Sequence, residues 1–283
     1  MQKYSIFNLI KNAFSNHQKW DLAWKDPTPK KEYDVVIIGG GGHGLATAYY
    51  LAKEHNITNV AIIEKGWIGG GNVGRNTTII RSNYMHDDNA LFSEFGMDLW
   101  RKMSQDLNYN VMFSPRGIIN LAHSDAQMNV YARRGNSMRL NGIDAELLNR
   151  EQVREIIPMA DFSENVRFPI FGGLMQPSAG TARHDAVAWG YARQADSMGV
   201  DIIQNCEVIG FDISGGKVEG VRTSRGDIKV KKIGLCVAGS TNILADKLNM
   251  TLPIETHLLQ ACVSEPVKPV LDKVVTFGAG HFY

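Results

Sequence analysis

Hydrophobic positions near the start of the chain follow two different periods in succession. A continuous apolar run at 34–38 is typical of a buried parallel strand, and a helical pattern occupies about 44–55. A second apolar segment at 59–64 follows that helix. The three segments predict one strand–helix–strand unit of a dinucleotide-binding fold.

Later segments show the same alternation without a second glycine-rich turn. Helical patterns are found at 91–103 and 151–157, with a short strand pattern at 117–122. Helical spacing returns at 185–198, and strand patterns follow at 200–204 and at 231–238, which leads into Gly239 and Ser240. We therefore expect a cofactor domain that is interrupted by a second, mixed domain.

The first 32 residues form a separate arm. Its apolar residues recur at helical spacing and predict an amphipathic helix that packs on the body or on a partner. These residues are Ile6, Leu9, Ile10, Ala13 and Phe14. Asn8 and Lys11 interrupt the apolar stretch, so we expect neither an export signal nor a membrane anchor.

Composition and charge exclude several classes of function. The 30 Lys and Arg residues balance 29 Asp and Glu residues, so no long-range field is expected to hold nucleic acid or anionic lipid. The cysteines at 206, 236 and 262 are odd in number and lack the spacing of a zinc site or a disulfide framework. We expect no metal site in this chain and a location in the reducing cytoplasm.

Candidate chemistry begins with a glycine-rich turn between the first strand and the first helix. Residues 39–44 read GGGGHG, which contains GxGxxG at the position where backbone amides approach a pyrophosphate. Glu64 ends the second strand, where a carboxylate accepts hydrogen bonds from ribose hydroxyls. The acid disfavours a 2′-phosphate, but the fingerprint alone does not separate FAD from NAD.

The segment after Glu64 carries a specific resemblance. EKGWIGGGN and RNTTIIRSNY, together with GGGGHGLATAYYLAKEH before them, resemble stretches of the beta subunits of heterotetrameric sarcosine oxidases, within the D-amino-acid-oxidase-like flavoprotein superfamily. LNYNVMFSPRGIINLAHS, TARHDAVAWGYARQAD and GVDIIQNCEVIGF resemble further stretches in the same order. The resemblance covers nearly the whole chain.

The resemblance implies the fold class in detail. This is α/β, with a Rossmann-like FAD-binding domain and an interleaved α+β substrate domain of the glutathione-reductase-like, D-amino-acid-oxidase type. The expected parts are an arm at 1–32, FAD-domain segments at 33–86 and 181–250, a mainly substrate-binding segment at 87–180, and the start of a returning sheet at 251–283. Relatives of this type continue beyond the position of Tyr283, so a C-terminal truncation is expected.

The resemblance also implies a non-covalent FAD, because the family position that carries a flavin-linked His elsewhere falls here near Trp67 and Asn72. The expected FAD-binding residues lie in the glycine turn, in the loop after Glu64 and on one later strand. They are Gly39, Gly41, Gly42, His43, Gly44, Glu64, Lys65, Asn72, Arg75, Thr77, Ile79 and Val208.

His184 is the sharpest single-residue expectation. By itself, a His at the start of a predicted helix is most often a surface or capping residue. In the family motif that TARHDAVAW resembles, however, this His carries FMN covalently, at the contact with the alpha subunit. A neutral imidazole nitrogen is a competent nucleophile for such a bond, and Arg183 could favour the anionic flavin ring.

The activity implied by the resemblance is oxidative demethylation of sarcosine at FAD. Electrons would pass to FMN and then to O2, giving glycine, H2O2 and either formaldehyde or 5,10-methylenetetrahydrofolate. The expected partners are the alpha, gamma and delta subunits, which alone would carry NAD, tetrahydrofolate and zinc. A substrate carboxylate requires a fixed cation, and the candidates are Arg75, Arg81 and Arg116.

Two alternatives remain at this stage. The first is a single-subunit FAD-dependent amine or amino-acid oxidase or dehydrogenase, of the glycine, proline or dimethylglycine type. The second is a non-catalytic flavin-binding subunit that uses the fold only for assembly. The motif around His184 argues against both.

Overall fold

The chain is organised as two units that alternate along the sequence. The structure, a computed structural model, describes residues 5–18, 22–163 and 165–278. One unit comprises Met1–Arg75 and Val187–Leu259, and the other comprises Asn76–Ala186 and Gln260–Tyr283. The units divide after residues 75 and 186, whereas the predicted boundaries fall after residues 86 and 180, and those boundaries stay a prediction.

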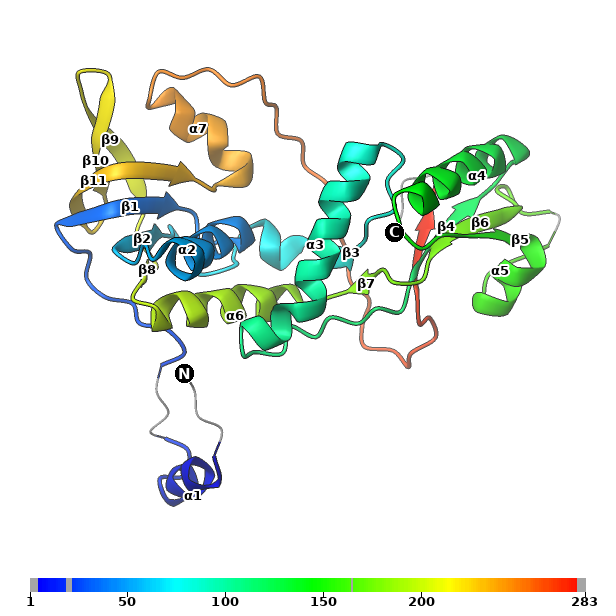
Figure 1. Cartoon of the computed structure of the whole chain (residues 1–283), viewed down its shortest axis with the longest axis horizontal. Coiled ribbons are helices and arrows are strands. Elements are labelled where there is room, and N and C mark those ends of the chain that lie inside the picture. Colours follow the sequence, from blue (N-terminus) through cyan, green and yellow to red (C-terminus); the bar gives the residue numbers. More distant parts are fainter. Residues whose placement is uncertain (1–4, 19–21, 164, 279–283) are drawn as a thin grey trace. The chain divides into compact units, whose positions relative to one another are not determined.

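A six-stranded sheet forms the core of the first unit, in the order β8-β2-β1-β11-β10-β9. Strands β8, β2, β1 and β11 are parallel, and β10 is antiparallel to both β11 and β9. The strand bounds are β1 Glu32–Ile38, β2 Val60–Ile63, β8 Asp201–Ile203, β9 Val208–Ser214, β10 Lys217–Thr223 and β11 Gly226–Leu235. In Figure 1 the blue strand β1 lies between β2 and the yellow β11.

The helices of this unit are α1 Ile6–Phe14, α2 Gly42–His55, α6 His184–Ser197, which begins in the second unit, and α7 Thr241–Asp246, with 3-10 turns η1 Asn72–Arg75 and η2 Ala238–Ser240. Helix α2 packs against β1 and β2, and it buries Leu45, Ala48, Tyr49 and Ala52, which lie on one helical face. Tyr49 also meets Tyr191 of α6 edge to face, with ring centroids 5.4 Å apart.

The sequence patterns predicted these elements closely, with one correction. The strand expected at 231–238 is β11, which begins at Gly226 and ends at Leu235. The chain then turns into η2, and Ala238 has a left-handed φ of 45° that a strand does not accommodate. The apolar run therefore continues past the strand because Val237 packs against the core cluster from the turn.

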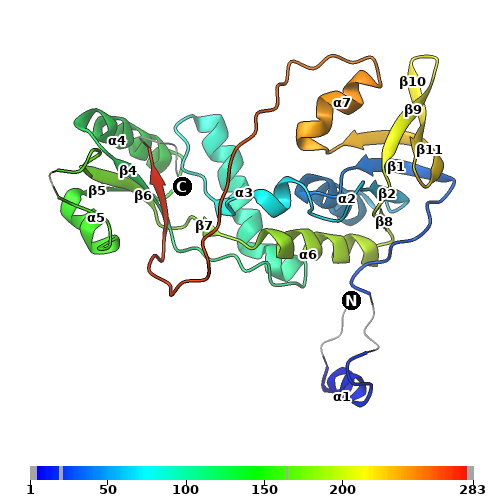
Figure 2. The same ribbon diagram turned by 180° about the vertical axis from the view of Figure 1, so that it is seen from behind.

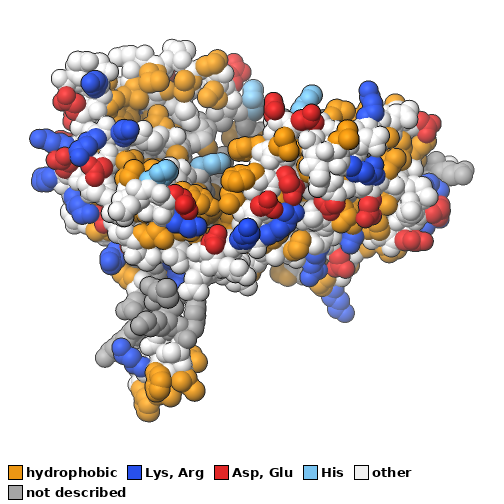
Figure 3. Space-filling view, viewed as in Figure 1, with side chains coloured by type: hydrophobic (Ala, Val, Ile, Leu, Met, Phe, Trp, Pro, Cys, Tyr) orange, Lys and Arg blue, Asp and Glu red, His pale blue; other side chains and the backbone are white. Residues whose placement is uncertain are grey.

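Helix α1 forms where the arm predicted it, starting at the N-cap Ser5, whose side chain accepts a hydrogen bond from the Asn8 amide. None of its residues is buried, and Phe7 and Phe14 are 78% and 89% exposed. Figure 3 shows the hydrophobic side chains on its surface. The apolar face of α1 is thus exposed among the described residues, and its packing on the body or on a partner stays a prediction.

A second sheet, in the order β12-β4-β6-β5, forms the core of the second unit (Figure 2). Strands β12 and β4 are parallel, and β6 is antiparallel to β4 and β5. A short antiparallel pair, β3 with β7, lies in the same unit. The bounds are β3 Ile79–Ile80, β4 Ile118–Ala122, β5 Glu146–Asn149, β6 Gly172–Gln176, β7 Gly180–Thr181 and β12 Val274–Phe277.

Three helices complete this unit: α3 Asp87–Asp106, α4 Asp125–Leu140 and α5 Arg150–Ile156. Helices α4 and α5 pack on β6 and its neighbours. Local sequence fixes where both begin, because Ser124 caps α4 and Asn149 forms a reciprocal capping box with Gln152 at α5. Among the described residues, no helix is long and apolar enough to cross a membrane.

Candidate functional site

The glycine turn after β1 can be formed only by glycine at two positions. Gly39 has φ of +109°, and a Cβ added to it would lie 2.3 Å from the carbonyl oxygen of Cys236. A Cβ on Gly44 would lie 2.0 Å from the carbonyl oxygen of Gly39. Larger residues would therefore push the turn apart, and these two glycines set its tight shape.

The start of α2 is open in the way that a bound phosphate requires. The N-cap Gly41 provides no side-chain cap, so the first amides of the helix keep their donors for another acceptor. Added Cβ atoms on Gly41 and Gly42 would meet only Val73, at 3.7 and 3.6 Å. The helix dipole and the free amides together favour an anion here. His43 is exposed at the same turn.

Glu64 joins the end of β2 to the glycine turn. Its Oε2 accepts a hydrogen bond from the Gly40 amide at 2.7 Å, and its Oε1 accepts one from the Gly66 amide at 2.9 Å. Each carboxylate oxygen retains further lone pairs, which can accept hydrogen bonds from a ribose. The structure thus brings the turn and the acidic residue together, as the fingerprint requires.

The loop after Glu64 is tied to the same turn. The Gly69 amide donates to the Gly40 carbonyl at 3.0 Å, and the Ile68 amide donates to Gln204 at 2.9 Å. The loop continues into η1, which contains Asn72 and Arg75, while Lys65 is exposed. The first contact holds the loop against the glycine turn, and the second ties it to Gln204, directly after β8.

The remaining predicted FAD-binding residues lie elsewhere. Val208 starts β9 and belongs to the core of the first unit, where it is 6% exposed. Thr77 is exposed and Ile79 lies in β3, and both belong to the second unit. The structure therefore groups residues 39–44 with Glu64 and η1 in the first unit, and the assignment of Thr77 and Ile79 to FAD stays a prediction.

The three candidate arginines differ in the groups that their guanidinium groups already contact. Arg75 donates from Nη1 to the Gly70 carbonyl at 2.6 Å. Arg116 pairs with Asp272 at 3.4 Å and lines a cavity of about 260 Å³, together with Ser114 and residues 271–274. Arg81 instead donates to a neutral amide and forms no ion pair with any described carboxylate. Arg116 is thus the candidate whose charge is paired with a carboxylate, whereas Arg75 and Arg81 donate to neutral acceptors among the described residues.

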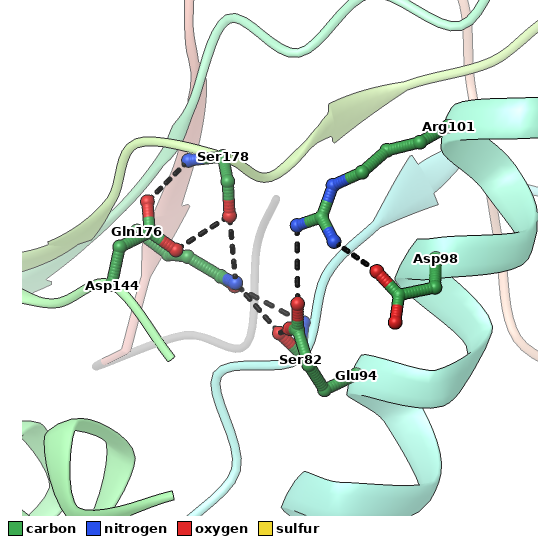
Figure 4. Close-up of polar contacts among 7 residues, drawn as sticks. All are labelled: Ser82, Glu94, Asp98, Arg101, Asp144, Gln176 and Ser178. Carbon is green, nitrogen blue, oxygen red and sulfur yellow. Dashed lines mark hydrogen bonds and ion pairs between the residues drawn. The ribbon is translucent and has the colours of Figure 1, made fainter. Parts of the chain in front are cut away.

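A buried polar network adjoins Arg81 that the sequence patterns did not reveal (Figure 4). Ser82 and Gln176 are both 0% exposed and hydrogen-bonded to each other twice, and Ser82 also donates to Glu94. The signal was present in part, because Ser82 and Asn83 are polar residues that directly follow Arg81 in a segment already of interest. Their partners come from distant parts of the chain, which no local pattern indicates.

His184 is the first residue of α6, as its predicted position at a helix start requires. Its Nδ1 is buried and has no hydrogen-bond partner among the described residues. Its neighbours are paired with each other, since Arg183 Nε donates to Asp185 at 2.8 and 3.1 Å. Burial opposes the shift, but hydrogen bonds from Arg183 and from the Ala186 amide hold the pKa of Asp185 below its ordinary value. The guanidinium of Arg183 is therefore already paired with the Asp185 carboxylate.

Across the described ranges, no three His, Cys, Asp or Glu side chains come together in a group that could hold a metal ion.

Comparison with known sequences gives matches over nearly the whole chain. The family model described as FAD dependent oxidoreductase matches residues 34–283. The curated "Sarcosine oxidase subunit beta" of Rhizobium meliloti (strain 1021) is 59% identical over 281 residues, covering 99% of this chain and 67% of that protein. The protein of the same name from Rhodobacter capsulatus is 51% identical over 283 residues, covering 100% of this chain and 68% of that protein. The chain spans about two thirds of these relatives.

Solved structures share the fold. The L-proline dehydrogenase from P. horikoshii aligns with a TM-score of 0.77 and 24% identity, covering 89% of this chain and 66% of that chain. The glycine oxidase from Bacillus cereus aligns with a TM-score of 0.65 and 24% identity, covering 76% of this chain and 57% of that chain. At this identity the likeness extends to the architecture alone, and it confirms the predicted fold class.

Proposed function

The chain belongs to the FAD dependent oxidoreductase family and, within it, to the sarcosine oxidase beta subunits, and from this premise we propose that it oxidatively demethylates sarcosine as part of a multi-subunit enzyme. The observation that carries the proposal is identity of 59% and 51% to two such subunits along almost the entire chain. The likeness to L-proline dehydrogenase and glycine oxidase supports the architecture but does not favour another substrate.

The glycine turn and Glu64 are the groups we assign to FAD. Glycines at 39 and 44 keep the turn tight, the open start of α2 offers amides to the pyrophosphate, and Glu64 accepts from the adenosine ribose. When bound, FAD supplies the acceptor for a hydride equivalent from carbon next to an amine. A carboxylate at position 64 also repels a 2′-phosphate, which disfavours NADP.

Arg81 is the residue we assign to the substrate carboxylate. A guanidinium already paired with a carboxylate would have to release it before binding a second one, and Arg116 faces Asp272 in this way. Among the described residues, the Asn83 side chain accepts a hydrogen bond from the Arg81 guanidinium, and the Tyr84 ring centroid lies 4.7 Å from its Cζ. Its charge is therefore available to orient sarcosine through a bidentate contact.

His184 is the residue we assign to a covalent FMN. A ring nitrogen of His184 would hold the FMN through the flavin 8α-methyl carbon, and the bound FMN would supply the electron acceptor that reduces oxygen to peroxide. The unpartnered Nδ1 shows that no hydrogen bond fixes the tautomer of this imidazole in the described chain. Both tautomers are thus available to this imidazole.

The partners and the compartment belong to the same proposal. We propose that alpha, gamma and delta subunits assemble with this chain and that NAD, tetrahydrofolate and zinc are bound by those subunits. The exposed apolar face of α1 supports a subunit contact. Three free cysteines support a reducing compartment such as the cytoplasm.

The test combines a flavin-fluorescence gel with substrate reduction in the protein co-expressed with its partner subunits. A denatured fluorescent band that is lost in His184→Ala and retained in the control His55→Ala is expected, together with bleaching of the FAD absorbance by sarcosine in the wild type. His55 ends α2 and is exposed. A band retained in His184→Ala would overturn the FMN assignment. Flavin that sarcosine does not reduce would overturn the substrate assignment.

A further inference from the structure

The backbone next to Arg81 is held by buried side chains. The Ser82 amide donates to Gln176 Oε1 at 3.0 Å, and Gln176 Nε2 donates to Ser82 Oγ at 2.7 Å. Ser82 Oγ donates in turn to Glu94 at 2.6 Å, as Figure 4 shows. Because Ser82 and Gln176 are fully buried, displacing either would leave unpaired polar groups away from water.

Asn83 holds the Arg81 guanidinium directly. Its Oδ1 accepts from Arg81 Nη1 at 2.6 Å, and its Nδ2 donates to Asn120 Oδ1 at 2.7 Å. Asn120 Nδ2 then donates to Thr276 Oγ1 at 2.5 Å. The amide orientation of Asn83 is fixed by this chain of bonds, because a rotated amide would place a donor against Arg81 and an acceptor against the Asn120 oxygen.

Asn83 also holds a second guanidinium. Arg134 donates from Nε and Nη2 to the Asn83 carbonyl oxygen, and burial, followed by the charge of Arg81, lowers the pKa of Arg134. Within the described residues, neither arginine forms an ion pair with a carboxylate. The two like charges therefore repel, and Arg81 keeps its position through the neutral acceptor of Asn83 rather than through a counter-ion.

We propose that Asn83 is a positioning residue that aims the Arg81 guanidinium at the substrate carboxylate, with its own amide oriented by Asn120 and Thr276. The inference rests on the proposed function, since it requires Arg81 to bind that carboxylate. A neutral acceptor suits this role. It orients the guanidinium without neutralising it, whereas an Asp at position 83 would compete with the substrate for the same charge.

The experiment measures ligand affinity in the flavin-loaded enzyme from the change in flavin absorbance. The probes are methoxyacetate, which replaces the amine of sarcosine with an ether oxygen, and the neutral methoxyacetamide. Arg81→Ala is expected to raise the Kd of methoxyacetate about 100-fold and Asn83→Ala about tenfold, from the usual strength of charged hydrogen bonds. The double variant is expected to lie within about twofold of Arg81→Ala, because Asn83 acts through Arg81.

Controls separate positioning from general damage. The exposed Asn129→Ala, on α4, is expected to leave both Kd values unchanged, and methoxyacetamide is expected to bind all variants alike. Thr276→Val, at the far end of the chain of bonds, provides a milder variant with an expected rise of about threefold should Asn83→Ala fail to fold.

Each outcome decides one of the two proposals. Additive losses in the double variant, or equal losses for the neutral probe, would show a merely structural Asn83 and overturn this inference alone. An unchanged methoxyacetate Kd in Asn83→Ala would also overturn this inference. If Asn83→Ala does not fold, an unchanged Kd in Thr276→Val would do the same. A methoxyacetate Kd that Arg81→Ala leaves unchanged, or no binding by the wild type, would instead remove Arg81 from the substrate site and with it the proposed carboxylate contact.

Discussion

The glycine turn of the first unit and the Arg81–Asn83 segment of the second hold polar groups in opposite ways. In the turn, backbone amides are presented by residues that lack side chains, and Glu64 provides the one side-chain acceptor. Around Arg81, the chain is held by hydrogen bonds to side chains from three other segments, of which Gln176 is fully buried. The glycine turn owes its shape to residues that lack side chains, whereas the Arg81–Asn83 segment owes its shape to hydrogen bonds between side chains.

The difference determines how each region tolerates change. A tight turn fails sterically, because an added methyl group has no space to occupy. A buried network fails electrostatically, because a removed partner leaves a polar group unsatisfied. The expected losses therefore differ in size and in the control that isolates them, and four substitutions test this comparison.

The largest loss is expected for Gly39→Ala. The new Cβ would lie 2.3 Å from the Cys236 carbonyl oxygen at a φ of +109°, so the free energy of unfolding should fall by about 3 kcal/mol or more. Gly71→Ala is the matched control, since nothing lies within 4 Å of its added Cβ, and it should change stability by less than about 0.5 kcal/mol. Urea unfolding measures both, and equal values would contradict a steric limit on the turn.

A smaller loss is expected for Gln176→Leu in the network. The substitution keeps much of the volume but leaves the buried Ser82 amide without its acceptor, which should cost about 2 kcal/mol in unfolding free energy. Gln105→Leu, on the exposed face of α3, serves as the control and should fall within about 0.5 kcal/mol of the wild type. A loss no greater than that of the control would mean that the network does not stabilise the unit.

Glu64→Gln tests the one side-chain contact of the glycine turn. The amide keeps a single acceptor oxygen for the Gly40 and Gly66 amides and removes the negative charge offered to the ribose, so FAD should bind about tenfold more weakly, or about 1.4 kcal/mol. Glu54→Gln at the exposed end of α2 should leave the FAD Kd unchanged. An unchanged FAD Kd in Glu64→Gln would show that the Glu64 carboxylate is not part of the cofactor site.

The smallest effect is expected for Asp185→Asn, which breaks an ion pair to the largely exposed Arg183. The free energy of unfolding should fall by about 0.5 kcal/mol or less at neutral pH. Because the pKa of Asp185 is below the ordinary 3.8 in the folded chain, its stabilisation is present above pH 3.8 and is lost as the pH falls through the lower folded value. Unfolding curves of wild type and variant should converge in acid, and a difference that grows there would contradict the assignment.

Much of the fold could be predicted from local patterns. The strand–helix–strand unit, the helix that starts at His184 and the amphipathic α1 all lie where periodicity predicted them. The predicted end of β11 was wrong, because an apolar run indicates burial and not strand conformation. The run continues past Leu235 since Val237 packs against the core from the following turn. The expected C-terminal truncation falls at 277–283, and residues 279–283 lie outside the described residues. The assignment of FMN to His184 stays a prediction.

The sequence by itself determined the cofactor-binding turn, because glycine spacing and an acid at the end of the next strand are local and their geometry follows from the backbone. It also determined the family, through motifs kept in order along the chain. Only the tertiary structure separated Arg116 from Arg75 and Arg81, since its pairing with Asp272 depends on a partner that is distant in sequence. Pairing of buried polar groups is decided by packing, and the local pattern does not contain it.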